Sequence, residues 1–115
     1  MDTRTKIVSQ AEARQRLAGQ SAHWLSGYFD PLLAEHVRML RERAAPDRRL
    51  VVEIANPARP LLPARARAEL VAALGMVDYV VLADAGNNSD APADAGITER
   101  FIQRVLQRHR PEGRG

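Results

Sequence analysis

The hydrophobic positions of this chain recur with two spacings that alternate along the sequence. Apolar residues three and four positions apart mark three helices, expected over about residues 10–18, 31–45 and 64–74. Short runs of consecutive apolar residues mark three strands, expected at about 24–27, 50–55 and 77–82. Strands that alternate with helices indicate parallel pairing, so the pattern predicts an α/β domain with right-handed crossovers.

Residues at the ends of these elements favour the same boundaries. Ser9 and Glu12 have the spacing of a capping box, and Gly19 is a suitable stop for the helix that follows. Asp30 followed by Pro31 has the form of a helix cap with proline at the first helical position. We therefore expect the second helix to begin at Pro31.

The last third of the chain has a different pattern. The segment of about 85–95 is rich in Gly, Asn, Asp and Ala, which predicts a flexible loop. Apolar residues at helical spacing, from Ile97 onward, then predict a last helix ahead of a tail at 110–115. We expect residues 1–115 to form a single domain.

The composition narrows the class of protein. The chain has no cysteine, which excludes disulfides and thiolate metal sites, and its histidines lack partners at ligand spacing, so we expect no metal site. No apolar run approaches the roughly 20 residues that span a membrane. The N-terminus also lacks the apolar core of a signal peptide. We expect a cytoplasmic protein that does not contact a membrane.

The chain is basic, with a net charge of +3 and a pI of about 10.2. Of its 17 basic residues only Lys6 is lysine, and arginine is well suited to holding phosphates in a fork. The arginines are spread along the chain, however, and aromatic residues make up only 4% of it, too few for a base-stacking surface. An arginine-rich nucleic-acid-binding module is therefore an alternative that the composition does not favour.

The stretch that carries most chemistry is Gly27-Tyr28-Phe29-Asp30, where a predicted strand ends in a glycine turn and a helix follows. Free amides at such a turn, together with the positive end of a helix dipole, favour a bound phosphate. On spacing alone this signal is weak, because many α/β proteins have such a turn.

The stretch resembles the glycine–x–phenylalanine–aspartate–x–x–histidine–x–glycine–histidine signature of the cytidylyltransferase-like nucleotidyltransferases. Gly27, Phe29, Asp30 and His36 stand at matching positions. Within that superfamily the chain is most similar to the nucleotidyltransferase domain of ADP-heptose synthases, and the similarity covers most of residues 6–83.

The resemblance implies a fold, a ligand and a set of site residues. The fold is a three-layer Rossmann-like parallel sheet, here a truncated half domain, in a family whose strand order is 3-2-1-4-5. His36 would be the catalytic phosphate contact, the nucleotide would be CTP or ATP, and Mg²⁺ would be needed if the protein is active. The residues implied in nucleotide binding are Gly27, Tyr28, Phe29, Asp30, Arg59 and Arg67.

Two positions depart from the signature. Its first histidine falls at Leu33, which cannot donate a hydrogen bond to a phosphate, and its second glycine falls at Glu35. Losing one preorganised donor costs on the order of a hundred- to a thousand-fold in rate. Glu35 adds a negative charge, which the positive end of the helix dipole stabilises. In this interpretation the carboxylate of Glu35 fills the anion site of the protein itself.

Each site residue also has a structural interpretation. His36 is then solvated or locally hydrogen-bonded, Asp30 is a helix cap, and Leu33 is a core residue. Arg59 and Arg67 are then surface arginines.

Three functions follow. The first is a degenerate nucleotidyltransferase-like protein, a pseudoenzyme with a binding or assembly role. The second is an active transferase that moves CMP or AMP to a sugar phosphate or similar phosphate, with missing groups supplied by a partner chain. The third is the nucleic-acid module. Because the first strand would be an edge in a half domain, we also expect a homodimer or a partner protein near Trp24 and Leu25.

Overall fold

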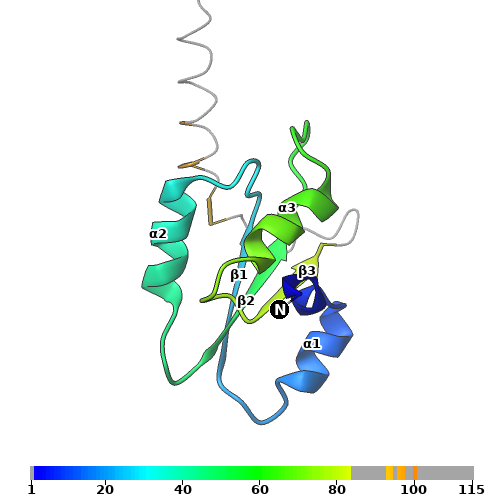
Figure 1. Ribbon diagram of the computed structural model, residues 1–115, viewed down its shortest axis with the longest axis vertical. Coiled ribbons are helices and arrows are strands. Elements are labelled where there is room, and N and C mark those ends of the chain that lie inside the picture. The colour runs from blue at the N-terminus through cyan, green and yellow to red at the C-terminus, as the bar shows by residue number, and fades with distance from the viewer. Residues whose placement is uncertain (1, 84–92, 95, 98–99, 101–115) are drawn as a thin grey trace, which may run out of the picture.

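The structure is a computed structural model that describes residues 2–83, 93, 94, 96, 97 and 100 of the chain. Its elements in chain order are η1 (Thr3–Lys6), α1 (Gln10–Arg16), β1 (Ala22–Gly27), α2 (Ala34–Arg43), β2 (Arg49–Ile54), α3 (Ala64–Ala72) and β3 (Tyr79–Leu82), shown in Figure 1.

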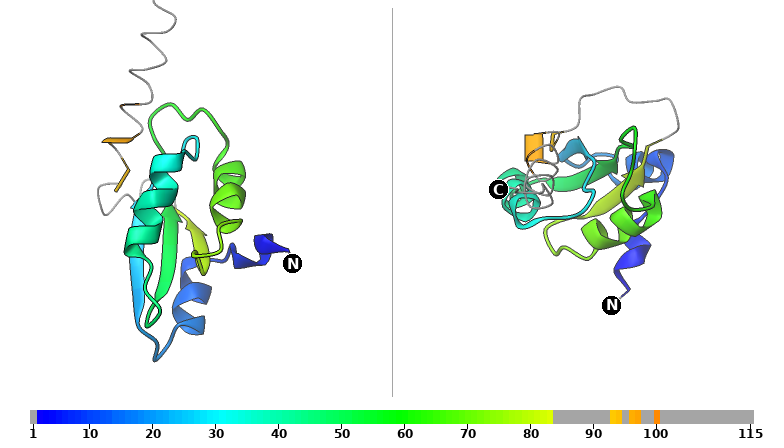
Figure 2. Two further views of the ribbon diagram at one scale, coloured as in Figure 1. Left: turned by 60° about the vertical axis from the view of Figure 1, so that its left-hand side comes forward. Right: turned by 90° about the horizontal axis from the view of Figure 1, so that it is seen from above.

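The three strands form one parallel sheet in the order β1-β2-β3. In the register of this sheet Leu25 lies opposite Val52, and Val52 lies opposite Val80. A helix follows each of the first two strands, which confirms the α/β class and the Rossmann-like half domain predicted from the sequence (Figure 2).

The two faces of the sheet have separate hydrophobic cores, because successive side chains of a strand point to opposite faces. On one face α2 and α3 pack through Leu40 and Val71 against Val52 and its neighbours. On the other face α1 packs through Ala13 against Val51. The molecule therefore has three layers, and the strands are apolar because both faces are covered.

The second helix starts later than predicted. It begins at Ala34, with Leu33 in an extended conformation as its N-cap, and the Asp30–Pro31 peptide bond that precedes it is cis. Asp30 does not cap this helix, because its carboxylate accepts hydrogen bonds from a different loop, at Leu61 and Leu62. The prediction of a cap at Asp30 is therefore wrong.

The apolar stripe of this helix is also narrower than expected. Leu40 is fully buried, whereas Leu33 and Val37 are only partly buried and belong to neither core. The interpretation of Leu33 as a core residue is wrong because Leu33 lies at the N-cap, at the end of α2 rather than along its packed face.

Other predicted segments have different outcomes. Ser9 caps α1 as predicted, with its Oγ accepting from the N–H of Glu12 at 3.0 Å. Most of the predicted loop at 85–95, nearly all of the last helix, and the tail at 110–115 lie outside the described residues. Within the described ranges, none of the helices has the length and hydrophobicity of a membrane-spanning segment.

Candidate functional site

The turn after β1 is built around a glycine and a phenylalanine. The ring of Phe29 is fully buried, and the backbone of Phe29 has a φ of +48°, in the left-handed region. A Cβ added to Gly27 would lie 2.5 Å from Cε2 of that ring and 3.1 Å from Oδ1 of Asp94. Glycine is therefore required here by space, because the ring and a carboxylate fill the volume that a side chain would take.

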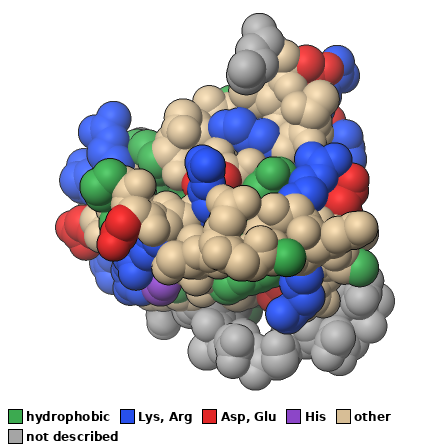
Figure 3. All heavy atoms as spheres, turned by 90° about the horizontal axis from the view of Figure 1, so that it is seen from below, with side chains coloured by type: hydrophobic (Ala, Val, Ile, Leu, Met, Phe, Trp, Pro, Cys, Tyr) green, Lys and Arg blue, Asp and Glu red, His purple; other side chains and the backbone are tan. Residues whose placement is uncertain are grey.

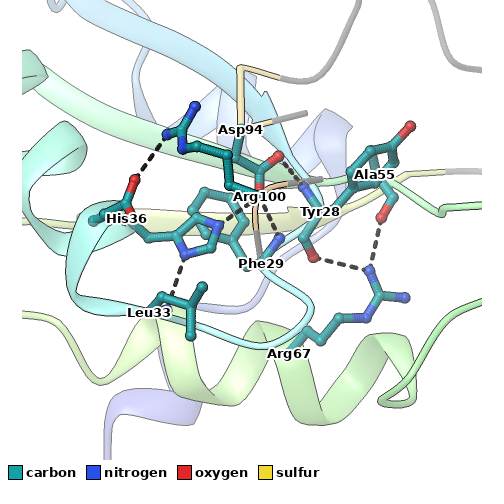
Figure 4. A network of polar contacts seen from close by, with 9 residues as sticks. Tyr28, Phe29, Leu33, His36, Ala55, Arg67, Asp94 and Arg100 are labelled. Carbon is teal, nitrogen blue, oxygen red and sulfur yellow. Dashed lines mark hydrogen bonds and ion pairs between the residues drawn. The ribbon is translucent and has the colours of Figure 1, made fainter. Parts of the chain in front are cut away.

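The backbone of this turn binds a carboxylate. The N–H of Tyr28 donates to Oδ1 of Asp94 and the N–H of Phe29 donates to its Oδ2, each at 2.7 Å (Figure 4). Burial raises the pKa of Asp94, but hydrogen bonds from His36 and from these two amides outweigh it, so the pKa lies below its ordinary value. Asp94 is therefore held as a carboxylate against the turn.

His36 completes the same network from the first turn of α2. Its side chain is fully buried, its Nδ1 accepts from the N–H of Leu33 at 2.9 Å, and its Nε2 lies 2.8 Å from Oδ2 of Asp94. Because Nδ1 is an acceptor, the ring proton lies on Nε2 and is donated to Asp94. The ring also packs on Phe29, with centroids 5.0 Å apart. Both nitrogens of His36 are therefore engaged inside the protein.

Arg67 of α3 supports this turn from the other side. Its side chain is only 1% exposed, and its Nη1 donates to the carbonyls of Tyr28 at 3.0 Å and Ala55 at 2.7 Å. Its Nε donates to the carbonyl of Leu62 at 3.0 Å. The interpretation of Arg67 as a surface arginine is wrong, because the guanidinium is buried and joins the loops that follow β1 and β2.

Comparison with known proteins gives a consistent answer. No family model matches the chain. The bifunctional protein HldE of Hyphomonas neptunium is 34% identical over 98 residues, which cover 77% of this chain and 19% of that protein. HldE of Vibrio parahaemolyticus is 33% identical over 110 residues, which cover 88% of this chain and 21% of that protein.

The chain is a relative of HldE. The relationship is nucleotidyltransferase-like and confirms the resemblance predicted from the signature at Gly27–His36. HldE of Magnetococcus marinus, at 35% identity over 91 residues, gives the same result. The chain spans about a fifth of the length of these curated relatives.

The two departures from the signature can be placed in this relative of HldE. Leu33 stands where the signature has its first histidine, and it presents only its backbone N–H to His36. Glu35 stands where the signature has glycine, and it forms an ion pair with Arg100 at 2.8 Å. The carboxylate that binds the turn is that of Asp94, and no sequence pattern favours Asp94 over Glu35 for this role.

The remaining predicted residues lie near the turn after β1. Asp30 is 3% exposed, and its two carboxylate oxygens accept from the N–H groups of Leu61 at 2.6 Å and Leu62 at 2.8 Å. Arg59 is exposed in the same loop. Gly27, Tyr28, Phe29, His36 and Arg67 meet in one network, whereas Asp30 holds the neighbouring loop.

A magnesium site was implied only for an active transferase. Among the described residues no group of three or more His, Cys, Asp or Glu side chains could hold a metal ion. The carboxylates of Asp30 and Asp94 already accept N–H donors at the turn. These residues therefore do not fit a protein-held magnesium ion.

Basic side chains are not confined to the turn after β1. Seen from below, arginine and lysine side chains stand at several separate places on the surface (Figure 3). Several of them pair with acids of the same chain, as Arg16 does with Glu12 and Arg49 does with Asp78. Such pairing reduces the positive charge that these side chains offer to a polyanion.

Proposed function

We propose that this chain is a nucleotidyltransferase-like protein of the cytoplasm that no longer catalyses nucleotidyl transfer and serves a binding or assembly role. The observation that supports this proposal most directly is the state of His36. Its side chain is fully buried and both of its ring nitrogens already have hydrogen-bond partners within the chain. A histidine in this state has no donor left for a phosphate.

The backbone donors of the turn are engaged in the same way. The amides of Tyr28 and Phe29 both point at Asp94, at 2.7 Å. Transition-state stabilisation requires preorganised donors at the position where negative charge develops. Here those donors are used by the protein itself, and Leu33 adds no side-chain donor.

The assembly role is supported by the outer edge of β1. The carbonyls of Ser21 and Gly27 accept hydrogen bonds from the N–H groups of Arg49 and Ala55, at the two ends of β2. Successive residues of a strand point their backbone groups to opposite sides, so those of Ala22 and Trp24 point away from β2. Among the described residues, these outward groups have no strand partner. Trp24 lies beside this edge and is 36% exposed. The unpaired backbone groups of the edge can form hydrogen bonds with a strand of a second chain.

The test is a turnover assay on the full chain. CTP and ATP are each incubated with Mg²⁺, a panel of sugar phosphates and the protein, and release of pyrophosphate is measured with wild type and with His36→Ala. We expect no release above background for either protein. Release by the wild type that His36→Ala abolishes would show an active transferase and would contradict the proposal.

A further inference from the structure

We propose that the carboxylate of Asp94 occupies an oxyanion site at the turn after β1 (the β1 turn). It excludes an external oxyanion while it is present, and an external oxyanion can take its place when the carboxylate is removed. This inference rests on the proposed function, because it explains why the N–H groups of Tyr28, Phe29 and His36 cannot bind the phosphate of a ligand. The site would accept a small tetrahedral oxyanion such as phosphate or pyrophosphate once the Asp94 carboxylate is removed.

The donors that surround Asp94 form an oxyanion site in their own right. Three N–H groups converge on one carboxylate, from Tyr28 at 2.7 Å, Phe29 at 2.7 Å and His36 at 2.8 Å. Two are consecutive backbone amides, an arrangement that forms anion-binding concavities in proteins. The Asp94 carboxylate is fully buried among them, so an external anion cannot reach the donors while it is present.

The donors are held in place by contacts that do not involve Asp94. The N–H of Leu33 fixes the ring of His36, and the Phe29 ring packs on that ring. The guanidinium of Arg67 binds the carbonyl of Tyr28 at 3.0 Å, which fixes the peptide next to the two donating amides. The site is therefore expected to keep its shape when the Asp94 side chain is shortened.

The residues beside Asp94 have attachments of their own. The N–H of Ala93 donates to the carbonyl of Ser26 at 2.7 Å, on the edge of β1 that faces away from β2. Arg100 pairs with Glu35 at 2.8 Å. Shortening Asp94 removes the carboxylate but leaves these two contacts, so the segment remains against the turn.

The experiment compares wild type with Asp94→Ala and Asp94→Gly in a buffer without oxyanions. Sodium phosphate and sodium pyrophosphate are added separately, without metal, and binding is followed by calorimetry and by the NMR amide shifts of Tyr28 and Phe29. We expect saturable binding to the variants at least about tenfold tighter than to wild type, because Asp94 keeps the binding-competent state sparsely populated. The shifts should concentrate at those two amides.

Three further variants make the test specific. Asp94→Asn still fills the site and should gain no oxyanion binding. Asp78→Ala removes a carboxylate that accepts from the N–H of Leu50 at 2.8 Å, at the other end of the strands, and should also gain none. The double variant Asp94→Ala with His36→Ala lacks one donor and should lose most of the gained affinity. CTP and ATP, added to Asp94→Ala in parallel, distinguish a nucleotide phosphate from a free oxyanion as the preferred ligand.

Folding of the variants is part of the same test. Anything that binds the folded state alone raises its stability, so phosphate should raise the thermal midpoint of Asp94→Ala and leave wild type unchanged. If Asp94→Ala is unfolded without oxyanions, phosphate must refold it. Absence of binding by folded variants, or absence of refolding, overturns this inference. Pyrophosphate release by the wild type would instead overturn the proposed function, so the two failures are distinguishable.

Discussion

Nε2 of His36 lies 2.8 Å from Oδ2 of Asp94, and both side chains are completely buried although 58 positions separate them in the sequence. This contact ties the start of α2 to a segment that follows β3. It also gives the histidine of a catalytic signature a structural partner. The chemistry of the turn is therefore set by a residue that is not part of the signature.

The space at Gly27 is predicted to be essential for stability. Gly27→Ala would place a methyl group 2.5 Å from Cε2 of the buried Phe29 ring. Overpacking of this kind costs roughly 2–3 kcal/mol, which chemical denaturation would show as a lower free energy of unfolding. Gly75→Ala is the matched control, because its Cβ would meet no atom within 4 Å. Equal stability of the two variants would contradict the steric role of Gly27.

The buried guanidinium of Arg67 is predicted to be irreplaceable by lysine. It donates to three backbone carbonyls, of Tyr28, Ala55 and Leu62, and an ammonium group cannot reproduce that planar fork. Arg67→Lys should lower the free energy of unfolding by about 2–4 kcal/mol. The control is Arg65→Ala, whose exposed ion pair with Glu69 is worth at most about 1 kcal/mol. A loss no larger for Arg67→Lys than for the control would show that its hydrogen bonds contribute little.

The stability that Asp94 contributes is predicted to depend on pH. Its folded pKa lies below the ordinary value of 3.8, because the hydrogen bonds of the turn outweigh the effect of burial. The contribution is therefore fully present above about pH 5 and is lost as the pH falls through the folded pKa. At neutral pH, Asp94→Asn should be roughly 2–4 kcal/mol less stable than wild type.

The measurement for Asp94 is a series of denaturation curves from pH 7 down to pH 3. The difference between wild type and Asp94→Asn should be constant near neutrality and should narrow at the acid end. A difference that widens as the pH falls would have the wrong sign and would rule out an ionised, hydrogen-bonded Asp94.

The edge of β1 is predicted to carry any self-association. Trp24→Glu places a charge beside the outward backbone groups of this strand, and charge on an edge strand opposes pairing. Light scattering after size-exclusion should show a dimer population in wild type, lost in Trp24→Glu. Leu70→Glu on α3, at a residue that is 45% exposed, is the control and should leave that population intact. If the wild type is a monomer at high concentration, the homodimer prediction is wrong and the edge of β1 would have to bind a different protein.

Local features of the sequence predicted local structure well. The Ser9 half of the predicted capping box is present, because Ser9 and the N–H of Glu12 lie within one helical turn, whereas the Glu12 side chain pairs with Arg16. The apolar runs at β2 and β3 marked their strands within about two residues, and a parallel sheet followed from their alternation with helices. The prediction at Asp30 failed, because its hydrogen-bond partners are 31 and 32 positions away, at Leu61 and Leu62.

The α/β class, the order of the elements and the relationship to nucleotidyltransferases could be predicted from the amino-acid sequence alone, since they depend on spacing and on residues close together in the chain. The contacts at the turn could be known only from the folded chain. Asp94 lies in a stretch whose composition marks it only as a loop, and its partners are 58 to 66 positions away. A buried carboxylate is stable only when it accepts hydrogen bonds. The donors that the fold brings to Asp94 are those of Tyr28, Phe29 and His36, within the signature stretch.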